Sequence, residues 1–175
     1  MFSLDENIFN FIHQLVGKGR LLDLSAIFFA DYFGYILILI ALVMIFSAKN
    51  FKDRIYNLAF VSLILLLSNG VFTQTIRFFY FRNRPFVDLD FVPLISKSAS
   101  EAAFPSGHAS FFFALAFAIF YLGKKRWSLA FLLVSLLIGI ARVYVGVHWP
   151  LDIVSGIIVA FISAFIVKSL LEPRK

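Results

Sequence analysis

Long apolar runs separated by short charged breaks make up most of this chain. Five runs are long enough for a helix to cross a bilayer core about 30 Å thick, which takes about 20 residues. We expect these transmembrane helices at residues 24–46, 55–77, 106–122, 127–147 and 151–171. The breaks between them are short, apart from a longer loop over residues 78–104. The pattern predicts a helical bundle that spans a membrane.

The first stretch, residues 4–16, has a weaker and one-sided pattern. Leu4, Ile8 and Phe11 fall on one face of a helix, and most polar residues of the stretch lie elsewhere. At about 20 Å this helix is too short to cross a bilayer, so we expect it to lie in the membrane interface. His13 belongs to it and is expected to be an interfacial residue without a functional role.

The composition agrees with a membrane protein. Of the 175 residues, 61% are hydrophobic, and the mean hydropathy is +0.92. A soluble domain of this length cannot bury so much apolar surface. The predicted fold class is an all-α integral membrane protein, a six-helix bundle with one short interfacial helix and five transmembrane helices, in a single domain over residues 1–175. Trp127 and Trp149 are expected in the interface belts.

The net charge of +6 does not indicate nucleic-acid binding, because the basic residues lie between apolar runs. There they fix topology and contact anionic headgroups. One face collects residues 49–54, residues 123–126 and the C-terminal tail, with nine basic residues against two acidic ones. By the positive-inside rule this face is cytoplasmic. The other face then points to the periplasm or the exterior of a bacterial plasma membrane.

Ionisable residues gather at the predicted outer ends of the helices, although they are far apart in sequence. Such positions are energetically unfavourable for charged groups and are often functional. The ionisable members are Arg77, Arg84, His108, Arg142, His148 and Asp152, and Ser106 and Gly107 stand beside His108 at a predicted helix start. Guanidinium groups match the oxygens of a phosphoryl group, and the free N–H groups at a helix start favour an anion near Gly107. These residues predict a phosphate site on the outer face.

Two histidines in this group suggest chemistry rather than binding alone. His148 and Asp152 are four residues apart, so the carboxylate can hold one imidazole nitrogen as N–H and leave the other as a nucleophile. His108 is then free to protonate the departing oxygen. No run of carboxylates has metal-ligand spacing, and cysteine is absent. Because the arginines supply positive charge, we expect a metal-independent reaction without a cofactor.

Three ordered motifs in the chain resemble those of a known family. They are Arg77-(six residues)-Arg84-Pro85, Pro105-Ser106-Gly107-His108 and Ala141-Arg142-(five residues)-His148-(three residues)-Asp152. These resemble the signature motifs of the type-2 phosphatidic acid phosphatase superfamily. The resemblance implies a phosphohistidine enzyme, with His148 as nucleophile, Asp152 as its orienting partner and His108 as general acid. It also implies a set of phosphoryl-binding residues, namely Arg77, Arg84, Ser106, Gly107 and Arg142.

Two positions depart from the family pattern. Arg77 stands where the first motif usually has lysine, and the two side chains differ in geometry. Ala141 stands where the third motif usually has serine, which removes one hydroxyl hydrogen bond worth about 1 kcal/mol. Neither change removes the predicted nucleophile, its partner or the acid.

Within the superfamily, the chain looks most like bacterial undecaprenyl-diphosphate phosphatases of the bacitracin-resistance type. This implies hydrolysis of the terminal phosphate of a polyprenyl diphosphate, with membrane lipids as the other partners. One alternative is a phosphatase for phosphatidate or phosphatidylglycerol phosphate. An alternative of another class is a non-enzymatic anion-binding or transport bundle, which needs the arginines but not an oriented histidine. The sequence leaves the oligomeric state open.

Other polar residues near the predicted site have simpler explanations. Arg82 and Lys97 are expected to be solvated or to face headgroups. Asn69 and Thr73 are expected to form hydrogen bonds between helices. Asp31 interrupts the first apolar run, and it either pairs with a site arginine or sits at the interface.

Overall fold

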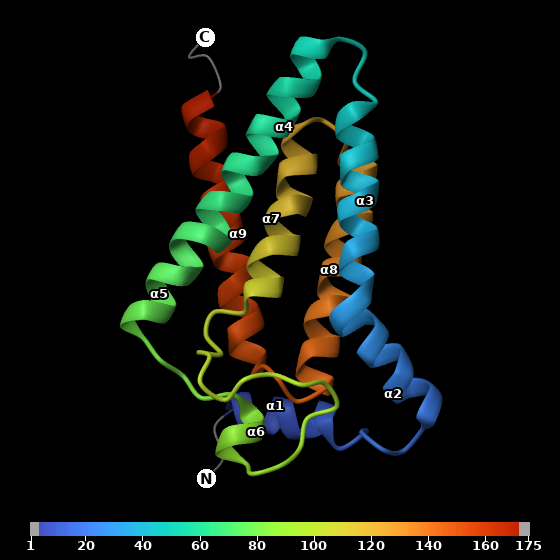
Figure 1. Cartoon of the computed structure of the whole chain (residues 1–175), viewed down its shortest axis with the longest axis vertical. Coiled ribbons are helices and arrows are strands. Elements are labelled where there is room, and N and C mark those ends of the chain that lie inside the picture. Colours follow the sequence, from blue (N-terminus) through green and yellow to red (C-terminus); the bar gives the residue numbers. More distant parts are fainter. Residues whose placement is uncertain (1–3, 172–175) are drawn as a thin grey trace.

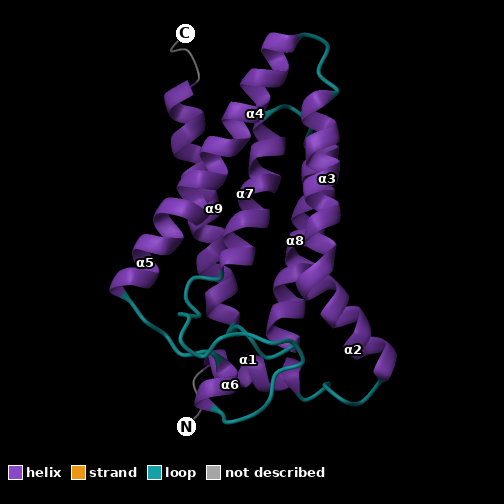
Figure 2. Cartoon of the chain, in the orientation of Figure 1, coloured by secondary structure: helices purple, strands orange, loops and turns teal. Residues whose placement is uncertain are grey.

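The computed structural model describes residues 4–171, and this part of the chain consists of helices and loops without a β-strand (Figure 2). The elements are α1 (Leu4–His13), α2 (Arg20–Ile27), η1 (Phe28–Tyr32), α3 (Phe33–Phe46), α4 (Phe51–Leu65), η2 (Leu66–Thr73), α5 (Gln74–Phe79), α6 (Pro85–Asp88), α7 (Gly107–Tyr121), α8 (Lys125–Tyr144) and α9 (Pro150–Leu171). The stretches η1 and η2 are π-helical and join their neighbours into two long helices. The all-α prediction is confirmed.

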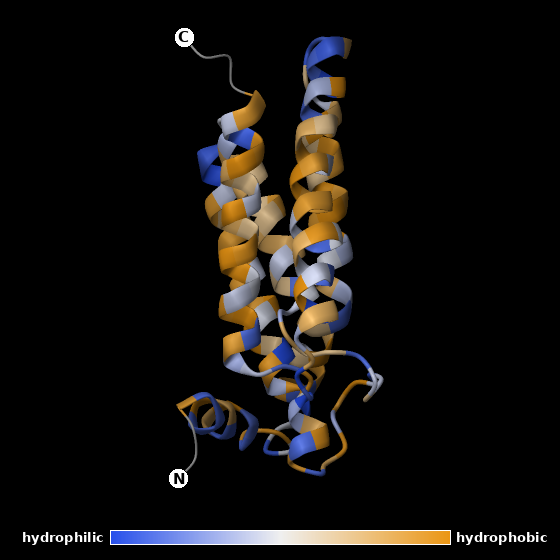
Figure 3. Ribbon diagram, turned by 90° about the vertical axis from the view of Figure 1, so that its left-hand side faces the viewer, coloured by the Kyte–Doolittle hydropathy of each residue, from blue (hydrophilic) through white to orange (hydrophobic). Residues whose placement is uncertain are grey.

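Four helices between residues 4 and 171 are long and apolar enough to cross a membrane: Arg20–Phe46, Phe51–Phe79, Lys125–Tyr144 and Pro150–Leu171. Hydrophobic residues dominate these helices, and more hydrophilic residues lie around the upper turn and the base (Figure 3). The fifth predicted span, residues 106–122, corresponds to the shorter helix α7 of 15 residues.

The described residues form seven continuous helices, whereas the sequence predicts six. The additional helix is α6, a single turn inside the loop over residues 78–104. Pro85 occupies its first turn, where a proline fits because its missing N–H would have no helical partner. One turn has no apolar periodicity, which is why the sequence pattern did not predict it.

Helix α7 lies at the centre of the bundle and packs against α8, α9 and α4 (Figure 1). Ala114, Ala116 and Ala118 on this helix have no exposed surface. The approach of α9 is especially close: a Cβ atom at Gly156 would lie 2.7 Å from the Cβ of Ala109 and 2.9 Å from the carbonyl oxygen of Ser106. The small residue therefore determines how near α9 comes to the start of α7.

Helix α1 lies across one end of the bundle rather than along it (Figures 1 and 3). Leu4 and Phe11 are exposed on this helix, whereas Phe9 is completely buried. The Phe9 ring packs 5.1 Å from that of Trp149, which is only 2% exposed. The prediction that Trp149 lies in an interface belt is wrong, because α1 covers it. Trp127 is half exposed.

The two ends of the bundle carry different connections (Figure 1). The α3–α4 turn, the α7–α8 turn and the end of α9 share one end. Helices α1 and α6 and the α8–α9 turn share the other. This arrangement groups residues 49–54 with residues 123–126, as the charge pattern predicts. Glu172, Arg174 and Lys175 of the tail, which entered the charge comparison, lie outside the described residues.

Candidate active site

A polar cavity of about 300 Å³ lies toward the end of the bundle that carries α1 and α6. Residues from α3, η2, α5, α7, α8 and the neighbouring loops line it. Its ionisable lining residues are two histidines, four cations and one carboxylate: His108, His148, Arg77, Arg84, Lys97, Arg142 and Glu101. This excess of positive charge makes the cavity suitable for an anion.

His148 lies in the turn between α8 and α9 and is 1% exposed. Its Nδ1 atom is 3.3 Å from Oδ2 of Asp152, and its Nε2 atom is 3.4 Å from Nη1 of Arg84. Burial, together with the positive charges of Arg142 and Arg84, lowers the pKa of His148 well below its ordinary value. The ring is therefore neutral. If Nδ1–H donates to Asp152, Nε2 keeps its lone pair on the side of Arg84.

Arg84 stands immediately before α6 and is 2% exposed. Its Nη1 donates to the carbonyl oxygen of Val147 at 2.9 Å, and its Nη2 donates to Glu101 at 3.3 Å. These contacts tie the loop before α6 to the turn that carries His148. The guanidinium group is thus held beside the imidazole by two separate segments.

Arg142 lies in the last turn of α8 and is 1% exposed. Its Nη1 donates to Ala30 O at 3.1 Å and to Oδ1 of Asp31 at 3.0 Å, and it lies 3.5 Å from Nε2 of His108. Both acceptors belong to the π-helical stretch η1. The first alternative for Asp31 is confirmed, because it pairs with a site arginine.

Two of the buried arginines retain a hydrogen-bond donor without a partner. Between residues 4 and 171, the buried side-chain polar atoms without a partner are Nε of Arg84, Nε of Arg142 and Oγ of Ser135. A buried donor left unpaired is unfavourable by about 1–3 kcal/mol. Both unpaired nitrogens belong to arginines that line the polar cavity.

The start of α7 forms another wall of the cavity. Ser106 is the N-cap of α7, and its side chain accepts a hydrogen bond from the N–H of Ala109 at 3.4 Å. Ahead of it, Nε and Nη2 of Arg77 donate to the carbonyl oxygen of Pro105 at 3.1 and 2.9 Å. Arg77 therefore fixes the backbone that leads into the helix, in addition to lining the cavity.

The structure brings the predicted site residues together. Six of the eight line the cavity: Arg77, Arg84, Gly107, His108, Arg142 and His148. The other two are fully buried beside it. Asp152 contacts His148 and also accepts the N–H of Trp149 at 2.8 Å, and Ser106 caps α7.

Sequence reasoning missed three contributors, Arg82, Lys97 and Glu101. Arg82 was expected to be solvated, but its Nη1 donates to Oδ1 of Asp152 at 2.9 Å and its Nη2 pairs with Asp5. The expectation failed because no sequence signal links the first helix to the loop that carries Arg82. Lys97, which was expected to be solvated or to face headgroups, lines the cavity. Its position in the same loop as Arg84 was the available hint.

Three other polar residues have structural contacts. Thr73 donates to Oγ of Ser110 at 2.9 Å, and this hydroxyl donates to Oδ1 of Asn69 at 3.3 Å, so the predicted bonds between helices are confirmed. Asn69 also lines the cavity. The Nδ1 atom of His13 lies 2.8 Å from the carbonyl oxygen of Tyr144, which gives this histidine a packing role between α1 and α8.

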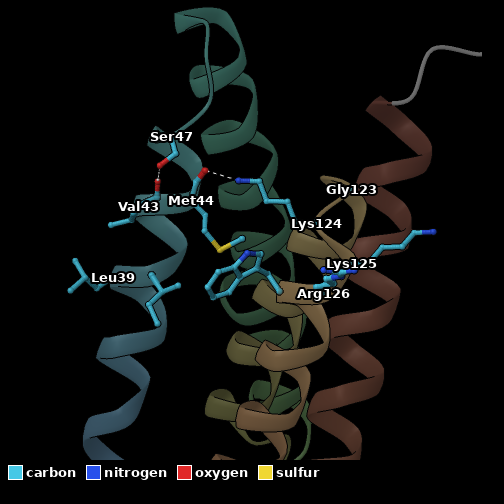
Figure 4. A pocket seen from close by; sticks show the side chains of 10 residues that line it. Leu39, Val43, Met44, Ser47, Gly123, Lys124, Lys125 and Arg126 are labelled. Carbon is cyan, nitrogen blue, oxygen red and sulfur yellow. Dashed lines mark hydrogen bonds between the residues drawn. The ribbon is translucent and has the colours of Figure 1, made fainter.

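A larger cavity of about 860 Å³ lies at the opposite end of the bundle, between α3 and the start of α8 (Figure 4). Leu39, Met44 and Trp127 contribute to its walls, and Lys124 donates to the carbonyl oxygen of Met44 at 2.8 Å. No histidine or carboxylate lines it. It therefore lacks a histidine that a carboxylate could orient, and the smaller polar cavity, which contains one, is the candidate active site.

Comparison with known proteins shows the family of the chain. The sequence profile of the PAP2 superfamily matches residues 57–175. The chain belongs to the PAP2 superfamily. Every predicted site residue falls inside the matched region.

Relatives of the chain include two proteins that are named as phosphatases and one that is named as a transport permease. The chain is 31% identical over 166 residues to undecaprenyl-diphosphatase BcrC of Bacillus subtilis, covering 93% of this chain and 82% of that protein. It is 29% identical over 165 residues to the bacitracin transport permease protein BcrC of Bacillus licheniformis, covering 94% of this chain and 79% of that protein. It is 28% identical over 150 residues to phosphatidylglycerophosphatase B of Bacillus subtilis, covering 78% of this chain and 70% of that protein.

The fold is also that of a solved structure, Aquifex aeolicus LpxE. The TM-score is 0.78 at 27% sequence identity, and the match covers 96% of each chain. Together with the four apolar helices, these relatives identify the protein as a multi-pass membrane protein of a lipid phosphatase family.

Proposed function

We propose that this protein hydrolyses the terminal phosphate of a polyprenyl diphosphate, such as undecaprenyl diphosphate, through a phosphohistidine intermediate. The main support for the proposal is the neutral imidazole of His148, which contacts the carboxylate of Asp152 through Nδ1 and lies in a cavity with four cationic side chains. A binding or transport bundle needs the cations, but it has no use for a carboxylate that orients a histidine.

The first step is transfer of the phosphoryl group to the enzyme. The arginines hold the terminal phosphate, and Nε2 of His148 attacks its phosphorus while Asp152 keeps the proton on Nδ1. A bond between Nε2 and phosphorus forms as the bond from phosphorus to the bridging oxygen breaks. His108 gives its proton to that oxygen, and the lipid monophosphate leaves. Positioning and charge stabilisation supply most of the rate.

The second step returns the enzyme to its starting state. Water attacks the phosphohistidine as His108 takes its proton, and the bond between phosphorus and Nε2 breaks. Inorganic phosphate leaves, and His148 is again a neutral imidazole. Because the guanidinium groups supply the charge for both steps, we expect the reaction to need no metal ion and no cofactor.

A diphosphate is the substrate class that we favour. The relative with 31% identity is an undecaprenyl-diphosphatase. The cavity also has a fourth cation, Lys97, beyond the three arginines, against the single carboxylate of Glu101. A diphosphate presents a second phosphate group to such a cation. Phosphatidylglycerol phosphate and phosphatidate are the second candidates, because another relative is phosphatidylglycerophosphatase B.

We also propose how the protein sits in its membrane. Residues 1–175 form one phosphatase domain, with α7 as a fifth spanning helix surrounded by the longer ones. Helix α1 lies in the interface, with its exposed apolar residues Leu4 and Phe11 toward lipid. The candidate active site then opens on the periplasmic or outer side of a bacterial plasma membrane. The basic α3–α4 and α7–α8 turns face the cytoplasm.

A phosphate-release assay tests the proposed function. The purified protein is expected to release phosphate from polyprenyl diphosphate in the presence of EDTA, and faster than from phosphatidate or phosphatidylglycerol phosphate. His148→Ala is expected to reduce the rate at least about 1,000-fold, because it removes the nucleophile. His13→Gln is the matched control, since His13 does not line the cavity. Retention of activity in His148→Ala would exclude the phosphohistidine mechanism.

A further inference from the structure

We infer that Arg82 and Asp5 are positioning residues that orient Asp152 and set its effective charge, and through it the reactivity of His148. The inference rests on the proposed function, in which His148 is the nucleophile. It assigns a role to the N-terminal helix α1, which lies outside the region matched by the PAP2 superfamily profile.

Hydrogen bonds connect four residues in series: Asp5, Arg82, Asp152 and His148. Arg82 donates from Nη1 to Oδ1 of Asp152 at 2.9 Å and from Nη2 to Oδ2 of Asp5. The other oxygen of Asp152 faces Nδ1 of His148. The other oxygen of Asp5 accepts the N–H of Leu151 at 2.8 Å. One guanidinium group therefore holds both carboxylates, each through its own nitrogen.

Burial makes these contacts important. The side chains of Asp5 and Asp152 are 4% and 0% exposed, and that of Arg82 is 22% exposed. A buried carboxylate needs paired hydrogen bonds to stay ionised, and removing one partner of such a pair is strongly unfavourable. The Arg82 guanidinium also lies 5.2 Å from the centre of the Trp149 ring, which restricts its position.

The charges of Asp5, Arg82 and Asp152 explain how Asp5 affects the reactivity of His148. Two carboxylates share one guanidinium, so the group as a whole keeps one negative charge. Without Asp5, Arg82 would balance Asp152 alone, and less negative charge would face His148. The His148 ring gains positive charge as Nε2 bonds to phosphorus, and negative charge on Asp152 stabilises that change in a buried site. Asp5 is therefore expected to speed phosphoryl transfer without touching the substrate.

The two residues do not belong to the substrate cavity. Asp5 and Arg82 line a different cavity, of about 620 Å³, together with Tyr80 and Phe104. Neither lines the cavity that holds His148. Their substitution should consequently change kcat more than KM, which distinguishes a positioning role from a binding role.

Asp5→Asn is the sharpest test, because asparagine keeps the shape and can still accept the N–H of Leu151. We expect kcat and the single-turnover rate of phosphoenzyme formation to fall about tenfold, with KM changed less than twofold. Asp90→Asn is the matched control. Asp90 is exposed and has a φ of 51°, a conformation that asparagine tolerates, so wild-type kinetics are expected.

Two Arg82 variants provide a second measurement. Arg82→Lys keeps the charge but cannot donate to two carboxylates in the fixed geometry of a guanidinium group, and Arg82→Gln loses the charge. The expected order of kcat is wild type, then Arg82→Lys, then Arg82→Gln. Because Asp5 acts through Arg82, the double variant Asp5→Asn/Arg82→Gln is expected to lose less than the product of the single losses.

Several results would overturn the inference. These are wild-type kcat in both Asp5→Asn and Arg82→Gln, a rise in KM at unchanged kcat, or fully multiplicative losses in the double variant. Thermal unfolding of each variant in detergent identifies losses of activity that are caused by unfolding. If Asp5→Asn and Arg82→Gln are unfolded, the kcat of Arg82→Lys tests the inference, and a wild-type value would overturn it. Activity in His148→Ala would instead overturn the proposed function, so the two failures are distinguishable.

Discussion

At the scale of single residues, the two cavity histidines have different surroundings. His148 has a carboxylate on Nδ1 and an arginine beside Nε2, whereas Nε2 of His108 lies 3.5 Å from Nη1 of Arg142. A carboxylate partner suits a nucleophile, since it fixes the tautomer and stabilises the cation that forms. A histidine without such a partner is better placed to give up a proton. The contacts thus support different roles for residues of the same type.

The proposed role of His108 predicts a dependence on the leaving group. His108→Ala should be less harmful with a polyprenyl diphosphate, which expels a stabilised phosphate monoester, than with phosphatidate, which expels an alkoxide that needs the proton. We expect kcat to fall about tenfold more on the second substrate. Parallel release assays measure this ratio. An equal loss on both substrates would argue against His108 as the general acid.

Arg77 illustrates how a departure from a family motif is accommodated. Two of its nitrogens donate to the carbonyl oxygen of Pro105. A lysine in this place has a single nitrogen for the same contact. Arg77 also lines the cavity, so the contact with Pro105 does not remove it from the site.

At the scale of helices, two features position the site. The π-helical stretches η1 and η2 lie in the two long helices beside the cavity, where η1 provides Asp31 and η2 provides Asn69. Such irregular stretches are frequent at functional sites because they redirect side chains and carbonyl groups. The second feature is the close packing of α9 on α7, which brings Asp152 next to Ser106, whose N–H donates to the carbonyl oxygen of Asp152 at 2.9 Å.

The packing of α9 on α7 predicts that Gly156→Ala is destabilising. The added Cβ would lie 2.9 Å from both the carbonyl oxygen of Ser106 and the backbone nitrogen of Ser110, so backbone must move. We expect a loss of about 1–3 kcal/mol in stability and reduced activity, because the start of α7 carries His108. Gly19→Ala is the control, since the nearest atom to its Cβ would be 3.8 Å away. Thermal unfolding in detergent measures both, and equal melting temperatures would contradict the packing argument.

At the scale of the whole molecule, the proposed orientation predicts which end of the bundle is accessible from outside the cell. The chain has no cysteine, so single cysteines report position without background. Ser100→Cys lies in an exposed loop at the active-site end, and Lys49→Cys is exposed at the other end. A membrane-impermeant maleimide is expected to label the first but not the second in intact cells. Both should react after lysis, and the reverse pattern in intact cells would invert the topology.

The overall architecture followed from local pattern. Long apolar runs predict helices wherever they occur, because only a helix satisfies its own backbone hydrogen bonds in lipid. The sequence pattern did not predict helix α6, because a single turn is too short to show an apolar periodicity. Nor did it predict the buried position of Trp149, since α1 covers that residue from the far end of the sequence.

The sequence by itself determined the helical class, the family and five of the seven ionisable residues that line the cavity. Spacing within a motif fixes which residues share a helix end, as with His148 and Asp152. Only the tertiary structure decided that Arg82 joins Asp5 to Asp152, that Asp31 pairs with Arg142, and that Lys97 reaches the cavity. The physical reason is distance along the chain: these contacts depend on how helices and loops pack, and no local periodicity encodes the partner of a single charged side chain.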